Sequence, residues 1–135
     1  MSDRILIADD EPNILISLEY LMKREGYEVH VARDGQEALD LLRSVQPRLV
    51  LLDVMMPNKN GFEVCQELRA EEALKDTLVL MLTAKGRDTD IAKGLGVGAD
   101  AYMTKPFSTK ELVVKVREML AAPRGAGAAA EGVAP

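Results

Sequence analysis

Residues 49–57 of the chain read LVLLDVMMP. The apolar run at residues 49–52 has no polar alternation, which is typical of a short strand whose two faces are both covered, as in a parallel sheet packed by helices on each side. A carboxylate at the end of such a strand has no role in packing. We therefore take Asp53 as the first candidate functional residue.

The rest of the chain alternates short apolar runs with amphipathic stretches. Strands are predicted at residues 4–9, 27–32, 48–53, 77–83 and 100–105, and helical spacing of apolar residues predicts helices at 12–26, 35–47, 61–72, 88–98 and 108–122. Three helix starts carry a capping residue followed three positions later by Glu, namely Asp34, Asn60 and Ser108. Regular strand–helix alternation predicts an α/β fold with a doubly wound, parallel, five-stranded sheet.

Composition restricts the class of protein. The 135 residues suit one domain, which we expect to span residues 1–122, with the Ala/Gly/Pro-rich residues 123–135 as a disordered tail or linker stub. A net charge of -5 argues against direct nucleic-acid contact. No apolar run approaches the roughly 20 residues that span a bilayer. The N-terminus lacks the features of a signal peptide, so we expect a cytoplasmic protein with no membrane partner. The single cysteine, Cys65, excludes an internal disulfide.

Polar residues gather at the ends of the predicted strands. Asp9 and Asp10 follow the first strand, Thr83 ends the fourth and Lys105 ends the fifth. In a parallel sheet these ends share one edge, where ligands bind. Clustered carboxylates repel one another, and Mg²⁺, which prefers oxygen ligands, relieves the repulsion. An aspartate beside Mg²⁺ and a lysine can act as a nucleophile toward phosphorus, so the pattern predicts aspartyl-phosphate chemistry at Asp53.

Four motifs carry a family resemblance: ILIADDEP, LVLLDVMMPNKNGFEV, MLTAKG and GADAYMTKPF. In this order they resemble the receiver domain of two-component response regulators, including single-domain chemotaxis receivers, over about residues 3–122. The resemblance implies a flavodoxin-like fold with strand order 2-1-3-4-5. It also implies a phosphorylation-activated signalling switch that is no enzyme toward other substrates and catalyses only its own phosphoryl transfer and slow self-dephosphorylation.

The resemblance also implies roles for single residues. Asp53 would accept a phosphoryl group from a sensor histidine kinase or a histidine phosphotransfer protein. Asp9, Asp10, Asp53 and the backbone carbonyl of Met55 would hold Mg²⁺. Lys105 would pair with the phosphoryl group or, before phosphorylation, with Asp53.

A switch is implied as well. The Thr83 hydroxyl would move toward the phosphoryl group, and Tyr102 would turn inward into the space that Thr83 leaves. The surface formed by the fourth helix, fifth strand and fifth helix would then change, and a downstream protein target or effector domain would read it. Family members usually have a cis peptide bond at the position of Lys105–Pro106.

Three positions depart from the common family pattern. Met55 and Lys85 occupy the places whose side chains tune the lifetime of the phosphoryl group. Neither orients water well, so we expect slow self-hydrolysis. DNA-binding relatives often carry two acidic residues before the aromatic residue of the fifth strand. Here the second is Ala101, which weakens the prediction of their charged dimer surface.

Two other classes of protein are alternatives to a receiver domain. A phosphatase with an aspartate nucleophile of the haloacid-dehalogenase type has a second Asp two positions later, where this chain has Met55. A flavin carrier needs a Ser/Thr-rich loop after the first strand, where this chain reads ADDEPN. Neither class explains Lys105 and Thr83.

The output of a receiver is left open by the sequence. One alternative is a stand-alone receiver that acts by protein contact. The other is the receiver fragment of a larger DNA-binding or enzymatic response regulator, whose effector domain would follow the tail. A phosphorylation-dependent homodimer fits either alternative.

Overall fold

The computed structural model describes residues 3–84, 92–93 and 95–122. Within them lie β1 (Arg4–Ala8), α1 (Pro12–Arg24), β2 (Glu28–Ala32), α2 (Gly35–Val45), β3 (Leu49–Asp53), α3 (Gly61–Ala70), β4 (Leu78–Ala84), β5 (Ala101–Lys105) and α5 (Thr109–Ala121). Each agrees within two residues at either end with a predicted element. Part of the predicted helix at 88–98 lies outside the described residues, whereas residues 92, 93, 95 and 96 are helical.

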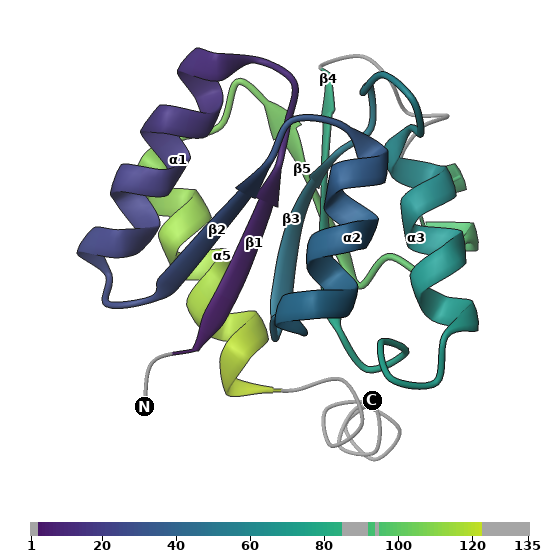
Figure 1. Cartoon of the computed structure of the whole chain (residues 1–135). Helices are drawn as coiled ribbons and strands as arrows, with labels where there is room; N and C mark the ends of the chain where they lie inside the picture. Colours follow the sequence, from purple (N-terminus) through teal and green to yellow (C-terminus); the bar gives the residue numbers. More distant parts are fainter. Residues whose placement is uncertain (1–2, 85–91, 94, 123–135) are drawn as a thin grey trace.

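All five strands run parallel in the order β2-β1-β3-β4-β5 (Figure 1). This confirms the predicted flavodoxin-like sheet. Helices α1 and α5 cover one face, and α2 and α3 cover the other. β3 is buried at every position, and β4 at every position except its last, as their unbroken apolar sequences predict.

Side chains of each strand alternate between two apolar cores. Beneath α1 and α5 the sheet contributes Ile5, Ile7, Leu49, Leu51, Leu78, Leu80 and Leu82. Beneath α2 and α3 it contributes Leu6, Ala8, Val50, Leu52, Val79 and Met81. Because neighbouring residues of a strand point to opposite faces, the position of any residue at a strand end can be assigned to one core or the other.

Helix starts follow the predicted caps. The side chains of Asp34, Asn60 and Ser108 accept hydrogen bonds from the backbone N–H groups of Glu37, Glu63 and Glu111. In α3 the Glu63 carboxylate also accepts from the backbone N–H of Asn60, which completes a capping box. The caps at Asp34 and Asn60 fix the start of α2, which precedes β3, and the start of α3, which follows the loop after β3.

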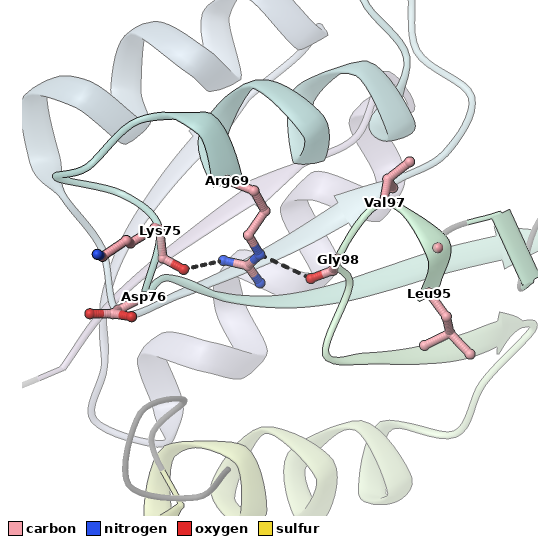
Figure 2. Close-up of a pocket in the computed structure, with 7 residues that line it drawn as sticks. Arg69, Lys75, Asp76, Leu95, Val97 and Gly98 are labelled. Atoms are coloured by element: carbon pink, nitrogen blue, oxygen red, sulfur yellow. Dashed lines mark hydrogen bonds between the residues drawn. The ribbon is translucent and has the colours of Figure 1, made fainter. Parts of the chain in front are cut away.

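Arg69 connects several segments at the amino ends of β4 and β5, the ends of the strands that lie away from the predicted site (Figure 2). Its guanidinium donates to the backbone carbonyls of Lys75 at 2.9 Å, Thr77 at 2.6 Å and Gly98 at 3.0 Å, and to the Asp100 carboxylate at 2.7 Å. A hollow of about 530 Å³ lies there, lined by Arg69, Lys75, Asp76, Leu95, Gly96, Val97 and Gly98. The bonds of Arg69 tie the start of β4 to the segment before β5.

The described residues contain no helix that combines the length and the apolar character needed to cross a membrane. Cys65 is fully buried in the core beneath α2 and α3.

Candidate functional site

Strand alternation brings three sequence-distant residues to one side of the sheet edge. Ile5 and Ile7 of β1 face α1 and α5, so Asp9, two residues further, projects to the same side. The same count from Leu51 leads to Asp53 and, on β5, from Met103 to Lys105. Parallel strands therefore deliver two carboxylates and an ammonium group to one corner of the molecule.

The three side chains are in contact. Lys105 Nζ lies 3.0 Å from Asp9 Oδ2 and 3.2 Å from Asp53 Oδ1. The Asp9 side chain is fully buried, and the Asp53 side chain is 8% exposed. The second oxygen of Asp9 accepts the backbone N–H of Glu11 at 2.9 Å. Asp9 is thus held from both sides, and its contact with Lys105 is a feature that the sequence reasoning missed.

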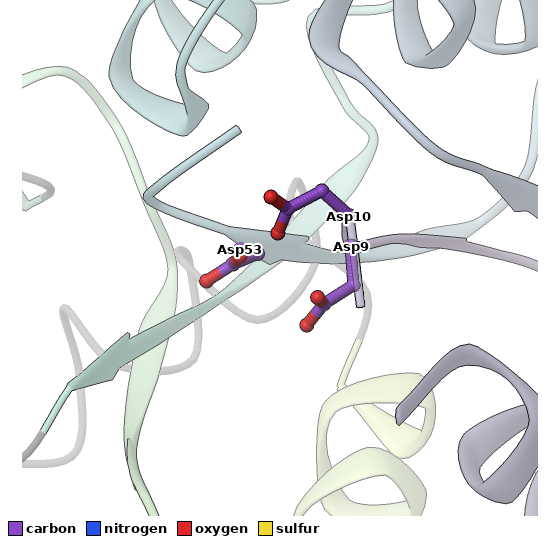
Figure 3. Close-up of side chains that lie close together, drawn as sticks. All are labelled: Asp9, Asp10 and Asp53. Carbon is purple, nitrogen blue, oxygen red and sulfur yellow. The ribbon is translucent and has the colours of Figure 1, made fainter. Parts of the chain in front are cut away.

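Asp10 completes an acidic cluster. Carboxylate oxygens of Asp9, Asp10 and Asp53 lie within 4.8 Å of one another, with Asp10 exposed to solvent (Figure 3). Among the described residues, the three carboxylates are balanced only by the ammonium group of Lys105, so this part of the site carries excess negative charge. Oxygen donors this close together, one of them open to water, fit a hard divalent cation such as Mg²⁺.

Electrostatics of the site act most strongly on Asp53. Burial raises the pKa of Asp53 to about 6, and the neighbouring charges of Asp9 and Asp10 raise it as well, whereas Lys105 opposes the shift. Burial alone would lower the pKa of Lys105, but the hydrogen bond to Asp9 and the charge of Asp53 outweigh it and raise that pKa. Ionisation of the carboxylate that the sequence marks as the acceptor is therefore disfavoured in the folded protein.

The loop after β3 runs tightly around Asp53. The N–H of Gly61 donates to the Val54 carbonyl at 2.9 Å, which closes the loop formed by residues 54–60. A Cβ at Gly61 would lie 2.5 Å from the backbone oxygen of Asp53, so only glycine allows α3 to begin so near this residue. Met55 lies in this loop with its side chain 59% exposed. A thioether is a poor ligand for a hard cation, so any part that Met55 takes in binding one falls to its backbone carbonyl.

Thr83 and Tyr102 lie on the other side of the sheet. By alternation both face the side covered by α2 and α3, and Tyr102 is paired in register with Met81, two residues before Thr83. Thr83 is fully buried, and its hydroxyl has no hydrogen-bond partner among the described residues. Tyr102 is 44% exposed. A buried hydroxyl without a partner is costly, so the Thr83 hydroxyl is a group that a new hydrogen bond would stabilise.

The chain around Lys105 holds two further features. The Lys105–Pro106 peptide bond is cis, as expected. An apolar hollow of about 450 Å³ lies beside it, lined by Ile14, Ala84, Lys105, Pro106 and Phe107. No sequence pattern predicts this hollow, because its residues come from three separate segments.

Two of the three departures from the common family pattern fall at residue 85 and at residues 100–101. Lys85 lies outside the described residues. Asp100, the acidic residue that precedes Ala101, points inward: its carboxylate accepts from Arg69 at 2.7 Å and from the backbone N–H of Val79 at 2.8 Å. Asp100 therefore serves the fold rather than a charged outer surface.

Fold and site together define a flavodoxin-like α/β domain with an acidic, lysine-bridged sheet edge. The chain belongs to the response regulator receiver domain family, and the model of this family matches residues 5–117. It is thus a receiver domain of two-component signalling, and the predicted family is confirmed. Domains of this family bind Mg²⁺ at an acidic cluster and interact with histidine kinases or phosphotransfer proteins.

Solved structures of such domains are similar over most of their length. A putative response regulator from Chloroflexus aurantiacus has 35% sequence identity and a TM-score of 0.86, covering 90% of this chain and 99% of that one. The receiver domain of a signal transduction histidine kinase from Syntrophus aciditrophicus has 31% identity and a TM-score of 0.83, covering 89% and 91%. The chemotaxis response regulator CheY4 of Vibrio cholerae has 30% identity and a TM-score of 0.83, covering 87% and 98%.

Proposed function

We propose that this chain is a phosphorylation-activated switch in which Asp53 accepts a phosphoryl group from the phosphohistidine of a sensor kinase or phosphotransfer protein. The observation that carries the proposal is the Lys105 ammonium bound to both Asp9 and Asp53 at a buried, acidic sheet edge. The apolar hollow beside Lys105 supports it, because it offers apolar surface next to the site that a donor protein could cover.

The transfer is an in-line displacement at phosphorus. A carboxylate oxygen of Asp53 attacks the phosphorus atom, the nitrogen–phosphorus bond breaks, and its electron pair stays on the donor imidazole. The product is an aspartyl phosphate. Asp53 attacks only in its ionised form, and the neighbouring Lys105 lowers its pKa against the effect of burial.

A divalent cation belongs to this proposal. Asp9, Asp10, Asp53 and the Met55 carbonyl would hold Mg²⁺, which when bound supplies positive charge to the oxygens of the transferring group. Lys105 supplies a second, compact positive charge once a phosphoryl oxygen replaces the Asp53 oxygen as its partner. The protein thereby balances negative charge that is added to an already acidic edge.

Signalling follows from new hydrogen bonds rather than from a new fold. The buried Thr83 hydroxyl gains a partner when it bonds a phosphoryl oxygen, and Tyr102 turns inward from its exposed position. Tyr102 borders a groove of about 430 Å³ between β5 and α5 that also includes Val114, which is 43% exposed. Phosphorylation would shift the balance between two arrangements of this surface, because the phosphoryl group contacts them differently.

The test uses a small phosphodonor and intact-protein mass. Metal-free protein is incubated with phosphoramidate, with and without Mg²⁺. We expect the mass of one phosphoryl group to be added only with Mg²⁺, and not at all in Asp53→Asn. Asp76→Asn, which changes an exposed aspartate away from the site, should behave like wild type. Full phosphorylation of Asp53→Asn would place the acceptor elsewhere.

A second experiment asks how the domain passes on its signal, by measuring whether it is a monomer or a dimer. Light scattering is measured with and without Mg²⁺ and beryllofluoride, which mimics a phosphoryl group on Asp53, with Asp53→Asn as the control. A monomer-to-dimer shift absent from the control would favour a receiver that activates an effector domain by dimerisation. A monomer in both states, with binding established by calorimetry, would favour a stand-alone receiver that signals through one switched surface.

A further inference from the structure

Helix α2 begins against the backbone of the loop after β3. The N–H of Gly35, the first residue of α2, donates to the carbonyl of Pro57 at 3.3 Å. A Cβ built on Gly35 would overlap the carbonyl oxygen of Lys59 and lie 2.6 Å from the Lys59 carbonyl carbon. Two backbone segments from different parts of the chain therefore meet with no room for a side chain between them.

The start of α2 is the firmer side of this contact. Asp34 caps the helix through the N–H of Glu37 at 2.8 Å, and Ala38 and Leu39 are fully buried in the core. If a methyl group were added at Gly35, the loop would have to move, because α2 is held by both its cap and its packing.

The loop that would move is the one that carries Met55. Lys59 N–H bonds the Pro57 carbonyl at 2.8 Å, and Lys59 Nζ pairs with Glu67 on α3 at 2.7 Å. Asn58 between Pro57 and Lys59 has a left-handed backbone, with φ of 68°. The loop thus has few ways to absorb a shift, and displacement at Lys59 is passed back along residues 54–58.

We propose that Gly35 is a positioning residue for the cation site. The close contact between Gly35 and Lys59 fixes the loop that presents the Met55 carbonyl, so the affinity for Mg²⁺ depends on a helix that supplies no ligand. This inference rests on the proposed function, because it takes the Met55 carbonyl as a ligand. Positioning of this kind acts through the ligand backbone and not through charge.

The test compares two glycine variants. Mg²⁺ alone is titrated calorimetrically into metal-free wild type, Gly35→Ala and Gly96→Ala. Gly96 has open space where its Cβ would stand, so it is the matched control. We expect Gly35→Ala to bind Mg²⁺ roughly tenfold more weakly, as is usual when the support of a metal ligand is disturbed. Gly96→Ala should bind like wild type.

Unfolding in EDTA separates positioning from a structural role. A structural role alone would lower the unfolding midpoint of Gly35→Ala while the folded variant keeps the wild-type affinity for Mg²⁺, and that result would overturn the inference. Absence of Mg²⁺ binding in wild type would overturn the proposed function and the inference with it. If wild type binds Mg²⁺ and Gly35→Ala binds it equally well, only the inference is overturned.

A second variant covers the case in which Gly35→Ala does not fold. Lys59→Met removes the ion pair with Glu67 but keeps the length of the side chain. Loss of a positive charge by itself would tighten Mg²⁺ binding, whereas a loosened loop weakens it. Weaker binding therefore supports the inference, and equal or tighter binding contradicts it.

Discussion

The Lys105 ammonium lies 3.0 Å from Asp9 Oδ2, so the lysine that ends the fifth strand is held by the carboxylate that follows the first. Family resemblance implied a pairing of Lys105 with Asp53 alone. If the proposed cation binds through Asp9 Oδ2, the second contact means that Lys105 competes with it for this oxygen. If Asp53 is phosphorylated as proposed, Lys105 still has the Asp9 carboxylate as a partner.

Lys105→Ala should separate metal binding from switching. We expect Mg²⁺ binding to be kept or modestly tightened, because Asp9 Oδ2 loses its competing partner. The change in tyrosine fluorescence on addition of beryllofluoride with Mg²⁺ should be lost. Calorimetry and fluorescence measure the two effects, with Lys75→Ala, an exposed lysine paired to Glu72, as the control. An unchanged fluorescence response would remove Lys105 from the mechanism.

Asp53 should make the stability of the metal-free protein depend on pH. Its pKa is about 6 in the folded protein against an ordinary 3.8, so folding favours the protonated form. The stabilisation is fully present below 3.8 and is lost as the pH rises through 6. Asp53→Asn mimics the neutral acid, so in EDTA it should be more stable than wild type above this range, by on the order of 1 kcal/mol after solvent screening.

Urea unfolding at a series of pH values measures this difference. It should shrink as the pH falls through 6 toward 3.8. A difference that is constant over the series would mean that Asp53 is ionised throughout and that the acidic cluster does not strain it. Asp76→Asn controls for the loss of one negative charge at an exposed position.

Asp10→Ala should change metal affinity and metal-free stability in opposite directions. Removing one carboxylate takes an oxygen donor from the cluster, so Mg²⁺ binding should weaken by roughly tenfold or more. The same change relieves repulsion on Asp53, so the unfolding free energy in EDTA should rise slightly. Calorimetry and urea unfolding provide the two values. If affinity stays at the wild-type value, Asp10 is no part of a cation site.

The fold could be predicted from the sequence because its signals are local. Unbroken apolar runs identify buried parallel strands, and caps such as Asn60 with Glu63 mark helix starts to within a residue. Strand ends then place Asp9, Asp53 and Lys105 along one edge. The order of the strands is a tertiary property, and only the family resemblance supplied it.

The remaining features of the site depend on contacts between segments far apart in sequence. Lys105 with Asp9 joins residues at opposite ends of the chain, and Gly35 with Lys59 joins a helix start to a loop. Neither pair has a local pattern, because the first contact depends on the order of the strands in the sheet and the second on where α2 begins against the loop after β3. The same is true of Asp100, which reads as a surface acid and is bound by Arg69.

Thr83→Val should stabilise the protein while it blocks the switch. The buried Thr83 hydroxyl has no partner among the described residues, so replacing it with a methyl group of similar shape should add about 1 kcal/mol to the unfolding free energy in EDTA. The fluorescence response to beryllofluoride should be lost, because valine cannot bond a phosphoryl oxygen. Thr104→Val, at the neighbouring half-buried position of β5, should give no such gain. A loss of stability in Thr83→Val would show that the hydroxyl is already bonded.

Met55 should set a long lifetime for the aspartyl phosphate. Its side chain is exposed two residues beyond Asp53 and offers nothing that orients a water molecule for attack on phosphorus. Met55→Asn places an amide there and should shorten the half-life of the phosphorylated protein by roughly tenfold, which is less than a true general base provides. Met55→Leu keeps the apolar character and should match wild type. Phosphorylated protein is separated from its donor, and intact mass is followed over time in excess Mg²⁺. Equal half-lives for Met55→Asn and Met55→Leu would mean that the lifetime is set elsewhere in the site.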